Sequence, residues 1–316
     1  QIGHCGNMTH RSTAGCIPVG ASTGFNLYSP TFCRGLRKDE LKQMAKDFGT
    51  AVNTARDAGF DCVEVHAGHG YLISQFLSPY TNRRRDEFGG SLENRMTFMK
   101  MCLEEVMKSA GSDMGVLVKT NMRDGFKGGL EIDDCLAVAR EIERCGVHAM
   151  VLSGGFVSKA PMYVMRGRMP VYSMTHYMKQ LWLKYGVRLA GKYMIPSVPF
   201  RELYFLDDAR RFREALDLPL VYVGGVVSRA NADEVLDREG FDFVQMGRAL
   251  LNEPDFVNRM RNDDTHRCSC DHVNYCIARM YSREMACHKH CADLTPEIRK
   301  EIEKIKRQNA KEEANG

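Results

Sequence analysis

Apolar residues along the chain fall into alternating helical and strand-like segments. Between residues 41 and 55 they recur at three- and four-residue steps, a helical stripe that ends at Gly59. A short run with β-branched residues, 61–65, follows directly. Strands separated by helices of about ten residues or more predict crossover connections and a parallel sheet. The same pair of patterns returns four times, with expected helices at 91–110, 132–145, 207–216 and 230–238 and expected strands at 116–119, 149–152, 220–223 and 243–246.

The long polar and Gly-rich segments favour a closed barrel over an open doubly wound sheet. They follow strands, at 66–90, 120–130 and 153–206, whereas the segments that lead into strands are short. A (β/α)8 barrel carries its active site on the strand-exit side, which matches this asymmetry. Five strands are clear, and Gln1–Ile2 adds a short stub. At roughly 30 residues per unit, we expect a TIM barrel that lacks its first two βα units.

Two segments differ enough in composition to be treated as separate regions. The barrel is expected to span residues 1–265, and a Cys-rich segment with a C-terminal helix to span 266–316. Thr295–Pro296–Glu297 is a helix start. The helix that follows is charged except for a narrow apolar stripe formed by Ile298, Ile302 and Ile305.

Composition and charge narrow the class of protein. With 316 residues, 44% hydrophobic and 27% charged, the chain is an ordinary globular protein. Its net charge of +4, with both signs interspersed, argues against a nucleic-acid partner. No apolar run approaches the ~18 residues of a membrane span or forms a signal-peptide core. Seven of the twelve cysteines lie before residue 146, and we interpret most of these as reduced core thiols of a cytoplasmic protein. The sequence leaves open whether the chain forms a homo-oligomer.

The most informative stretch is the turn after the strand at 61–65. His66 lies at the strand exit, and His69 and Tyr71 follow within a Gly-containing turn. Two imidazoles so placed can point nitrogens at one ligand atom with a phenol close by, which suits binding a carbonyl or anionic oxygen while an acid donates a proton. Metal ligation is the competing hypothesis, although no nearby carboxylate or third histidine completes a zinc site. Two purely structural histidines are the remaining alternative.

This turn and the residues behind it resemble the old yellow enzyme family of NADH:flavin oxidoreductases. The agreement begins with His-Ala-Gly-His-Gly-Tyr-Leu at 66–72 and continues with Gln-Phe-Leu-Ser-Pro at 75–79, Asn-Arg at 82–83 and Gly-Gly-Ser at 89–91. Gln1 and His4 resemble the family's third-strand segment, while 223–226 and 246–256 resemble its seventh and eighth strand exits. The resemblance covers most of residues 1–260 and is weakest between 156 and 206.

The resemblance implies a flavin mononucleotide (FMN) in the mouth of the barrel. Gln1 matches the amide that hydrogen-bonds the flavin's pyrimidine edge. Lys119 stands where the family usually has Arg, so it keeps the positive charge near the reduced flavin but loses the planar two-pronged contact. Close backbone approach and positive potential at the phosphate are expected from Gly224, Gly225, Gly247 and Arg248.

The implied activity is that of an ene-reductase. NAD(P)H would supply a hydride through the flavin, and the substrate would be a small electron-poor alkene conjugated to a carbonyl or similar group. His66 and His69 would bind the substrate oxygen, and Tyr71 would protonate the α-carbon. An inactive fragment or interaction protein is the alternative from another class, because a barrel without two strands would expose sheet edges.

The Cys-rich segment raises a metal alternative. Cys270, Cys276 and Cys287 resemble part of the [4Fe–4S] segment of family members related to 2,4-dienoyl-CoA reductase and trimethylamine dehydrogenase. Val273 stands where a cysteine is expected, and cluster ligation depends on tight spacing, so we expect no metal. Zinc bound by these cysteines with His288 or His290, and an iron–sulfur flavoenzyme acting on acyl-CoA or amine substrates, are the alternatives.

Overall fold

The computed structural model of the chain describes residues 1–280 and 283–314. The chain divides into two compact units. Unit 1 comprises Gln1–Ala160, Phe205–Val223 and Glu239–Val244, and unit 2 comprises Pro161–Tyr204, Gly224–Arg238 and Gln245–Gly316. Each unit is described by itself below. The expected division at residue 265 stays a prediction.

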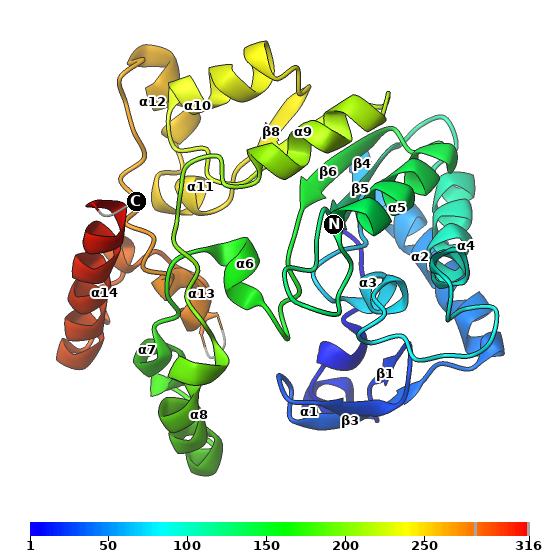
Figure 1. Cartoon of the computed structure of the whole chain (residues 1–316), viewed down its shortest axis with the longest axis horizontal. Helices are drawn as coiled ribbons and strands as arrows, with labels where there is room; N and C mark the ends of the chain where they lie inside the picture. Colours follow the sequence, from blue (N-terminus) through cyan, green and yellow to red (C-terminus); the bar gives the residue numbers. More distant parts are fainter. Residues whose placement is uncertain (281–282, 315–316) are drawn as a thin grey trace. The chain divides into compact units, whose positions relative to one another are not determined.

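A five-stranded parallel sheet forms the centre of unit 1 (Figure 1). Its strands follow chain order: β4 (Cys62–His66), β5 (Gly115–Asn121), β6 (Ala149–Ser153), β7 (Leu220–Val223) and β8 (Phe243–Gln245). The connecting helices are α2 (Lys38–Asp57), α4 (Leu92–Ala110), α5 (Ile132–Arg144) and α9 (Leu206–Ala215). The five strands and these helices confirm the sequence pattern, and apolar strand residues such as Val116 and Val118 are fully buried.

The stub at the start of the chain pairs with this sheet. Ile2 forms a parallel bridge with Val65; its N–H donates to the Glu64 carbonyl at 2.9 Å, and its carbonyl accepts from the His66 N–H at 2.9 Å. The stub therefore extends the parallel order beyond β4. Together these strands form part of a (β/α)8 barrel, as predicted.

Unit 1 also holds small elements that the hydrophobic pattern does not predict. A three-stranded sheet in the order β1-β3-β2 comprises β1 (Val19–Gly20), β2 (Gly24–Asn26) and β3 (Thr31–Gly35). Around it lie η1 (Gly6–Met8), α1 (Arg11–Ala14) and α3 (Leu72–Leu77). These strands contain Gly, Asn, Thr and Arg among few apolar residues, so they lack the continuous apolar run that reveals β4 to β8 in the sequence.

Unit 2 is helical in its described part. Its elements are α6 (Pro161–Met165), α7 (Val171–His176), α8 (Leu181–Met194), α10 (Arg229–Asp233), the π-helical η2 (Glu234–Arg238), α11 (Arg248–Asn252), α12 (Phe256–Asn262), α13 (Tyr275–Arg279), η3 (His288–His290) and α14 (Pro296–Ala314). The helix expected at 230–238 is thus split between α10 and η2. The expected start of α14 at Pro296 is confirmed.

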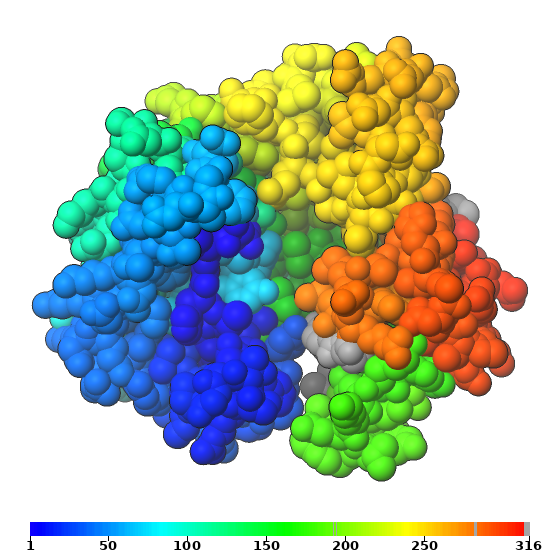
Figure 2. Space-filling view, turned by 180° about the vertical axis from the view of Figure 1, so that it is seen from behind, coloured from blue at the N-terminus to red at the C-terminus, as the bar shows by residue number. Residues whose placement is uncertain are grey.

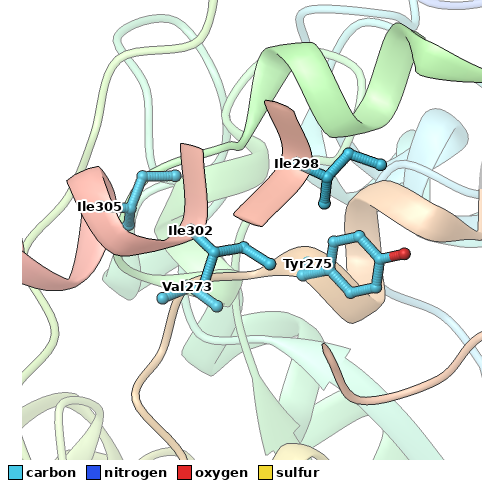
Figure 3. Packing of buried hydrophobic residues seen from close by; sticks show 5 residues of the cluster. All are labelled: Val273, Tyr275, Ile298, Ile302 and Ile305. Carbon is cyan, nitrogen blue, oxygen red and sulfur yellow. The ribbon is translucent and has the colours of Figure 1, made fainter. Parts of the chain in front are cut away.

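The apolar stripe of α14 packs on the Cys-rich segment. Figure 2 shows the red atoms of α14 beside the orange atoms of that segment. Ile298, Ile302 and Ile305 are buried against Val273 and Tyr275 (Figure 3). Val273, the residue in place of an expected cysteine, therefore serves the core of this unit.

The first seven cysteines only partly match the prediction of core thiols. Cys33, Cys102 and Cys135 are buried, but Cys5, Cys16 and Cys62 are exposed. That interpretation was wrong for the exposed three: Cys5 and Cys16 lie on irregular surface segments, and Cys62 begins an otherwise buried strand. All twelve cysteines are free thiols. Among the described residues, no helix combines the length and apolar character needed to cross a bilayer.

Candidate active site

The turn between β4 and α3 is built around close backbone packing. His69 has φ of +59° and Gly70 has φ of +81°, so the chain reverses through the left-handed region. A Cβ on Gly68 would lie 2.7 Å from Asn121 Oδ1, and one on Gly70 would lie 2.6 Å from the Phe156 ring. Neither position has room for a side chain, so both must be glycine. The close packing fixes the backbone of the turn and therefore the direction of its side chains.

The structure brings the three expected side chains of this turn together. His69 Nδ1 lies 3.3 Å from His66 Nε2, and the two rings meet edge to face with centroids 4.9 Å apart. The Tyr71 ring lies 4.7 Å from the His66 ring. Two imidazoles and a phenol thus share one spot at the carboxyl end of β4, although their catalytic roles stay predictions.

A serine that the sequence analysis missed completes this cluster. Ser153 ends β6, and its hydroxyl lies 2.8 Å from His69 Nε2. Both ring nitrogens of His69 therefore contact protein atoms, whereas His66 Nδ1 is buried without a hydrogen-bond partner. The imidazoles bond to each other here, and His66 Nδ1 is the nitrogen that remains for a ligand. A polar residue at a strand exit was the available signal for Ser153.

Both imidazoles are held in the neutral form. Burial, and then the positive charge of Lys119, lower the pKa of His66 to about 4. Burial lowers the pKa of His69 well below its ordinary value, with further contributions from His66 and Lys119. At neutral pH each ring therefore has one donor and one acceptor nitrogen, an arrangement that suits hydrogen bonding to an uncharged carbonyl oxygen.

A buried polar network supports the turn from the ends of neighbouring strands. The His69 N–H donates to Asn121 Oδ1 at 3.0 Å, and the Asn121 amide donates to Asp124 Oδ1 at 2.9 Å. Asp124 also accepts from the Ser78 hydroxyl at 2.6 Å and the Leu130 N–H at 2.8 Å. Burial raises the pKa of Asp124 even though these three donors oppose the shift. The network fixes which way Asn121 presents its oxygen to His69.

Lys119 and Gln1 meet on a carboxylate that the sequence analysis did not consider. Lys119 Nζ donates to Glu64 Oε1 at 2.8 Å, and the Gln1 amide donates to the same oxygen. The side chains of the ion pair are each 13% exposed. The charge expected beside the flavin is therefore shared with Glu64, which lies two residues before His66, the register partner of Lys119.

Gly224 and Gly225 lie in unit 2, and contacts within that unit explain why glycine is needed at Gly225. Gly224 has φ of +136° and Gly225 has φ of +79°. The Gly225 carbonyl accepts from the Leu203 N–H at 3.2 Å, and a Cβ on Gly225 would lie 2.8 Å from that nitrogen and 2.9 Å from the Arg201 carbonyl oxygen. Packing against the 201–203 segment thus explains Gly225, and its contact with a phosphate stays a prediction.

Gly247 and Arg248 start α11 in the same unit. Gly247 precedes the helix, and a Cβ there would meet nothing within 4 Å. Arg248 Nη1 donates to Asn274 Oδ1 at 2.8 Å, and Asn274 in turn donates to the Arg166 carbonyl at 2.6 Å. One edge of the Arg248 guanidinium is therefore anchored within unit 2. Its expected role at a phosphate also stays a prediction.

The Cys-rich segment is held by hydrogen bonds in its described part. Cys287 Sγ donates to Asn252 Oδ1 at 3.3 Å, and His288 Nε2 lies 2.9 Å from an oxygen of Asp271. Burial raises the pKa of Cys270 and Cys287, and raises that of Cys276 to about 11, so these thiols are protonated at neutral pH. Within residues 1–280 and 283–314, no three His, Cys, Asp or Glu side chains are grouped to hold a metal ion.

A family model described as NADH:flavin oxidoreductase / NADH oxidase matches residues 7–182. The chain belongs to this family. Among its relatives, the 4,4'-dithiodibutanoate disulfide reductase of Rhodococcus erythropolis is 37% identical over 89% of this chain and 70% of that protein. An NADH oxidase of Thermoanaerobacter brockii is 27% identical over 86% of this chain and 38% of that protein. The chain thus spans 70% of the length of the first of these relatives and 38% of the length of the second.

Solved structures show the same barrel fold. A 2-naphthoyl-CoA reductase complex aligns with 96% of this chain and 43% of its own, at a TM-score of 0.73 and 20% identity. An old yellow enzyme homologue from Zymomonas mobilis aligns with 84% of this chain and 67% of its own, at a TM-score of 0.62 and 22% identity. The predicted resemblance to this flavin oxidoreductase family is confirmed.

Proposed function

We propose that this chain is an FMN-dependent NAD(P)H oxidoreductase that reduces activated carbon–carbon double bonds. The observation that supports it best is the cluster of two neutral imidazoles and a phenol at the carboxyl end of β4. Free thiols at all twelve cysteines support a reducing, cytoplasmic location. A small electron-poor alkene is the proposed substrate class.

The residues of unit 1 fit a flavin by the chemistry of their donors. The Gln1 amide and the Lys119 ammonium meet on Glu64, and together they offer donors to the oxygen and nitrogen atoms of a pyrimidine edge. In unit 2, Gly224, Gly225, Gly247 and Arg248 are proposed to hold the phosphate. When bound, the flavin supplies two-electron hydride transfer from NAD(P)H to the substrate.

The site residues of β4 and its turn bind the substrate and move one proton. His66 uses its unpartnered nitrogen to hydrogen-bond the substrate oxygen, while His69 and Ser153 hold the His66 ring through a chain of contacts. Drawing electron density toward that oxygen makes the β-carbon accept hydride. The Tyr71 hydroxyl then gives its proton to the α-carbon, which completes the addition of two electrons and two hydrogens. Solvent returns the proton to Tyr71.

A disulfide is the second candidate substrate. The Rhodococcus relative that is 37% identical over 89% of this chain is named for reducing 4,4'-dithiodibutanoate. Reduction of a disulfide also consumes two electrons and two protons, giving two thiols. The same tyrosine would protonate the departing thiolate.

One experiment separates these candidates from each other and from an inactive chain. The purified protein, incubated with FMN, is reduced anaerobically with NADH or NADPH and then mixed with cyclohex-2-enone or with 4,4'-dithiodibutanoate, while flavin absorbance is followed. We expect fast reoxidation by the enone with formation of cyclohexanone. Reoxidation by the disulfide alone would replace the first proposal with the second. Failure to retain FMN, or to be reoxidised by either compound, would contradict both.

A further inference from the structure

Helix α8 in unit 2 has an unusual exposed apolar face. Five large side chains point away from the unit: Leu181 (62% exposed), Trp182 (70%), Tyr185 (61%), Leu189 (82%) and Tyr193 (84%), of which all but Trp182 follow at one-turn spacing. We call them the α8 stripe. Monomeric proteins rarely expose a large continuous apolar patch, and where one occurs it commonly marks an interaction site.

The opposite side of α8 is firmly seated on its own unit. Val187 packs on the core cluster formed by Met162, Met169, Met174 and Ala278. Lys184 Nζ donates to the His176 carbonyl at 2.8 Å, and Arg188 Nε donates to the Thr175 hydroxyl at 2.9 Å. The helix is thus fixed with the stripe outward, and Figure 2 shows green atoms of this segment on the surface.

We propose that the α8 stripe is a two-fold interface with a second copy of this chain. The stripe residues 181, 185, 189 and 193 are symmetric about Val187, so an antiparallel pair of α8 helices places Leu181 against Tyr193 of the other copy. The same operation places Tyr185 against Leu189. Each contact then joins a large ring to a branched aliphatic side chain, which packs better than like against like.

The surface area and the shape of the face both suit such a pair. With about 200 Å² for a fully exposed aromatic side chain, the stripe offers roughly 600 Å² per copy, most of the ~800 Å² per partner of a standard interface. Gly186 is exposed beside the stripe, midway along the helix, and a Cβ there would meet nothing within 4 Å. A second helix can therefore approach closely along that side of the stripe.

A membrane surface is the occupant that this arrangement favours less. Membrane-surface helices flank their apolar face with lysine and arginine side chains that reach the lipid headgroups. Of the basic side chains described on α8, Lys184 binds a carbonyl of its own unit, and Arg188 lies 4.3 Å from the Tyr172 ring centroid. Both are occupied within unit 2, which leaves the uncharged stripe to pair with a surface of its own kind.

Sedimentation velocity of the full chain over a range of micromolar concentrations tests the proposal. We expect wild type to move reversibly from one to two copies of the 35.8 kDa chain. Tyr185→Glu should weaken that association at least tenfold, because it buries a charge at the interface. Phe60→Glu, at an apolar residue of unit 1 that is 64% exposed, is the matched control and should associate like wild type.

A mixing experiment tests the antiparallel register and shows that the variants are folded. Tyr185→Glu and Leu189→Lys should each be monomeric alone, and an equal mixture should recover dimers, because residue 185 of one copy meets residue 189 of the other. A monomeric wild type, a dimer that Tyr185→Glu does not weaken, or a mixture that stays monomeric would overturn the proposal. Pelleting of a monomeric wild type with phosphatidylglycerol vesicles, lost in Tyr185→Glu, would assign the stripe to a membrane instead.

Discussion

The conformation of His69 shows how strongly the candidate site is determined by its surroundings. A non-glycine residue at φ of +59° costs on the order of 1 kcal/mol, and such residues persist where neighbouring contacts over-determine them. Here the Asn121 side chain holds the His69 N–H, while Ser153 and His66 hold its ring. Strain at a residue with three such constraints is typical of a binding or catalytic turn. The neutral His69 ring is thereby held in one orientation.

Tyr71→Phe tests the proton donor at this scale. We expect reoxidation of the reduced flavin by cyclohex-2-enone to slow by about 100-fold or more, because a positioned general acid contributes at least this much. Reduction of the flavin by NADPH should be unchanged, since it needs no proton from Tyr71. Stopped-flow absorbance measures both half-reactions. Tyr80→Phe, a change to another tyrosine of unit 1 that packs on Phe126, is the matched control, and equal rates in both variants would contradict the assignment.

At the scale of elements, residues at the ends of β5 and β6 hold His69, which lies on the turn after β4. Asn121 lies in register with Ser153, so the two residues that contact His69 are neighbours across adjacent strands. Asp124 follows β5 and fixes the Asn121 amide from the side away from His69. The turn is therefore oriented by side chains from two other strands, and its geometry depends on the sheet remaining intact.

Asp124→Asn should disturb this support without touching the proposed substrate. An amide cannot accept from Ser78, Leu130 and Asn121 together, so one buried donor loses its partner at about 2 kcal/mol of unfolding free energy. We also expect roughly tenfold slower reoxidation by the enone, because a rotated Asn121 releases His69. Urea unfolding and stopped-flow measurements provide the two values. Asp133→Asn, at a side chain that is 85% exposed, should change neither.

The ion pair between β4 and β5 makes a second prediction at this scale. Lys119→Met leaves the Glu64 carboxylate, 13% exposed, without its cation and should lower the unfolding free energy by about 3 kcal/mol. Adding Glu64→Gln to that variant should restore most of the loss, because the remaining group is neutral. Urea unfolding of the two variants measures the difference. Equal stability of the single and double variants would show that the pair contributes little.

The strands of the parallel sheet in unit 1 and the helices α2, α4, α5 and α9 could be predicted because their periodicity is local. The run at 116–118 and the stripe after residue 41 each reveal one strand or helix without knowledge of the rest of the chain. Ser153 and Glu64 could not be assigned in that way, because their importance depends on which strands are neighbours and in which register. A short motif could not explain Gly225 either, because the backbone of Leu203, which is distant in the sequence, leaves no room for a side chain there.

At the scale of the whole molecule, buried neutral histidines make the chain sensitive to acid. His66 in unit 1 has a pKa of about 4, and His272 in unit 2, which stacks on Phe200 at 3.5 Å, has a pKa lowered to about 3 by burial and by Arg248. Unfolding exposes both rings to water, where their pKa returns to about 6.5. Below that pH the unfolded chain binds protons that the folded chain does not, so stability falls as the pH falls toward 4.

His66→Asn should flatten this dependence by a predictable amount. Between pH 7.5 and pH 5, protonation of His66 in the unfolded chain alone should lower the unfolding free energy by about 2 kcal/mol, and the variant should lack that share of the loss. Urea unfolding at the two pH values, followed by circular dichroism, measures the difference directly. His10→Asn, a change outside the cluster, should keep the wild-type dependence. If His66→Asn lost as much stability as wild type, the ring would be protonated in the folded protein, and its proposed role as a neutral donor to a carbonyl oxygen would fail with it.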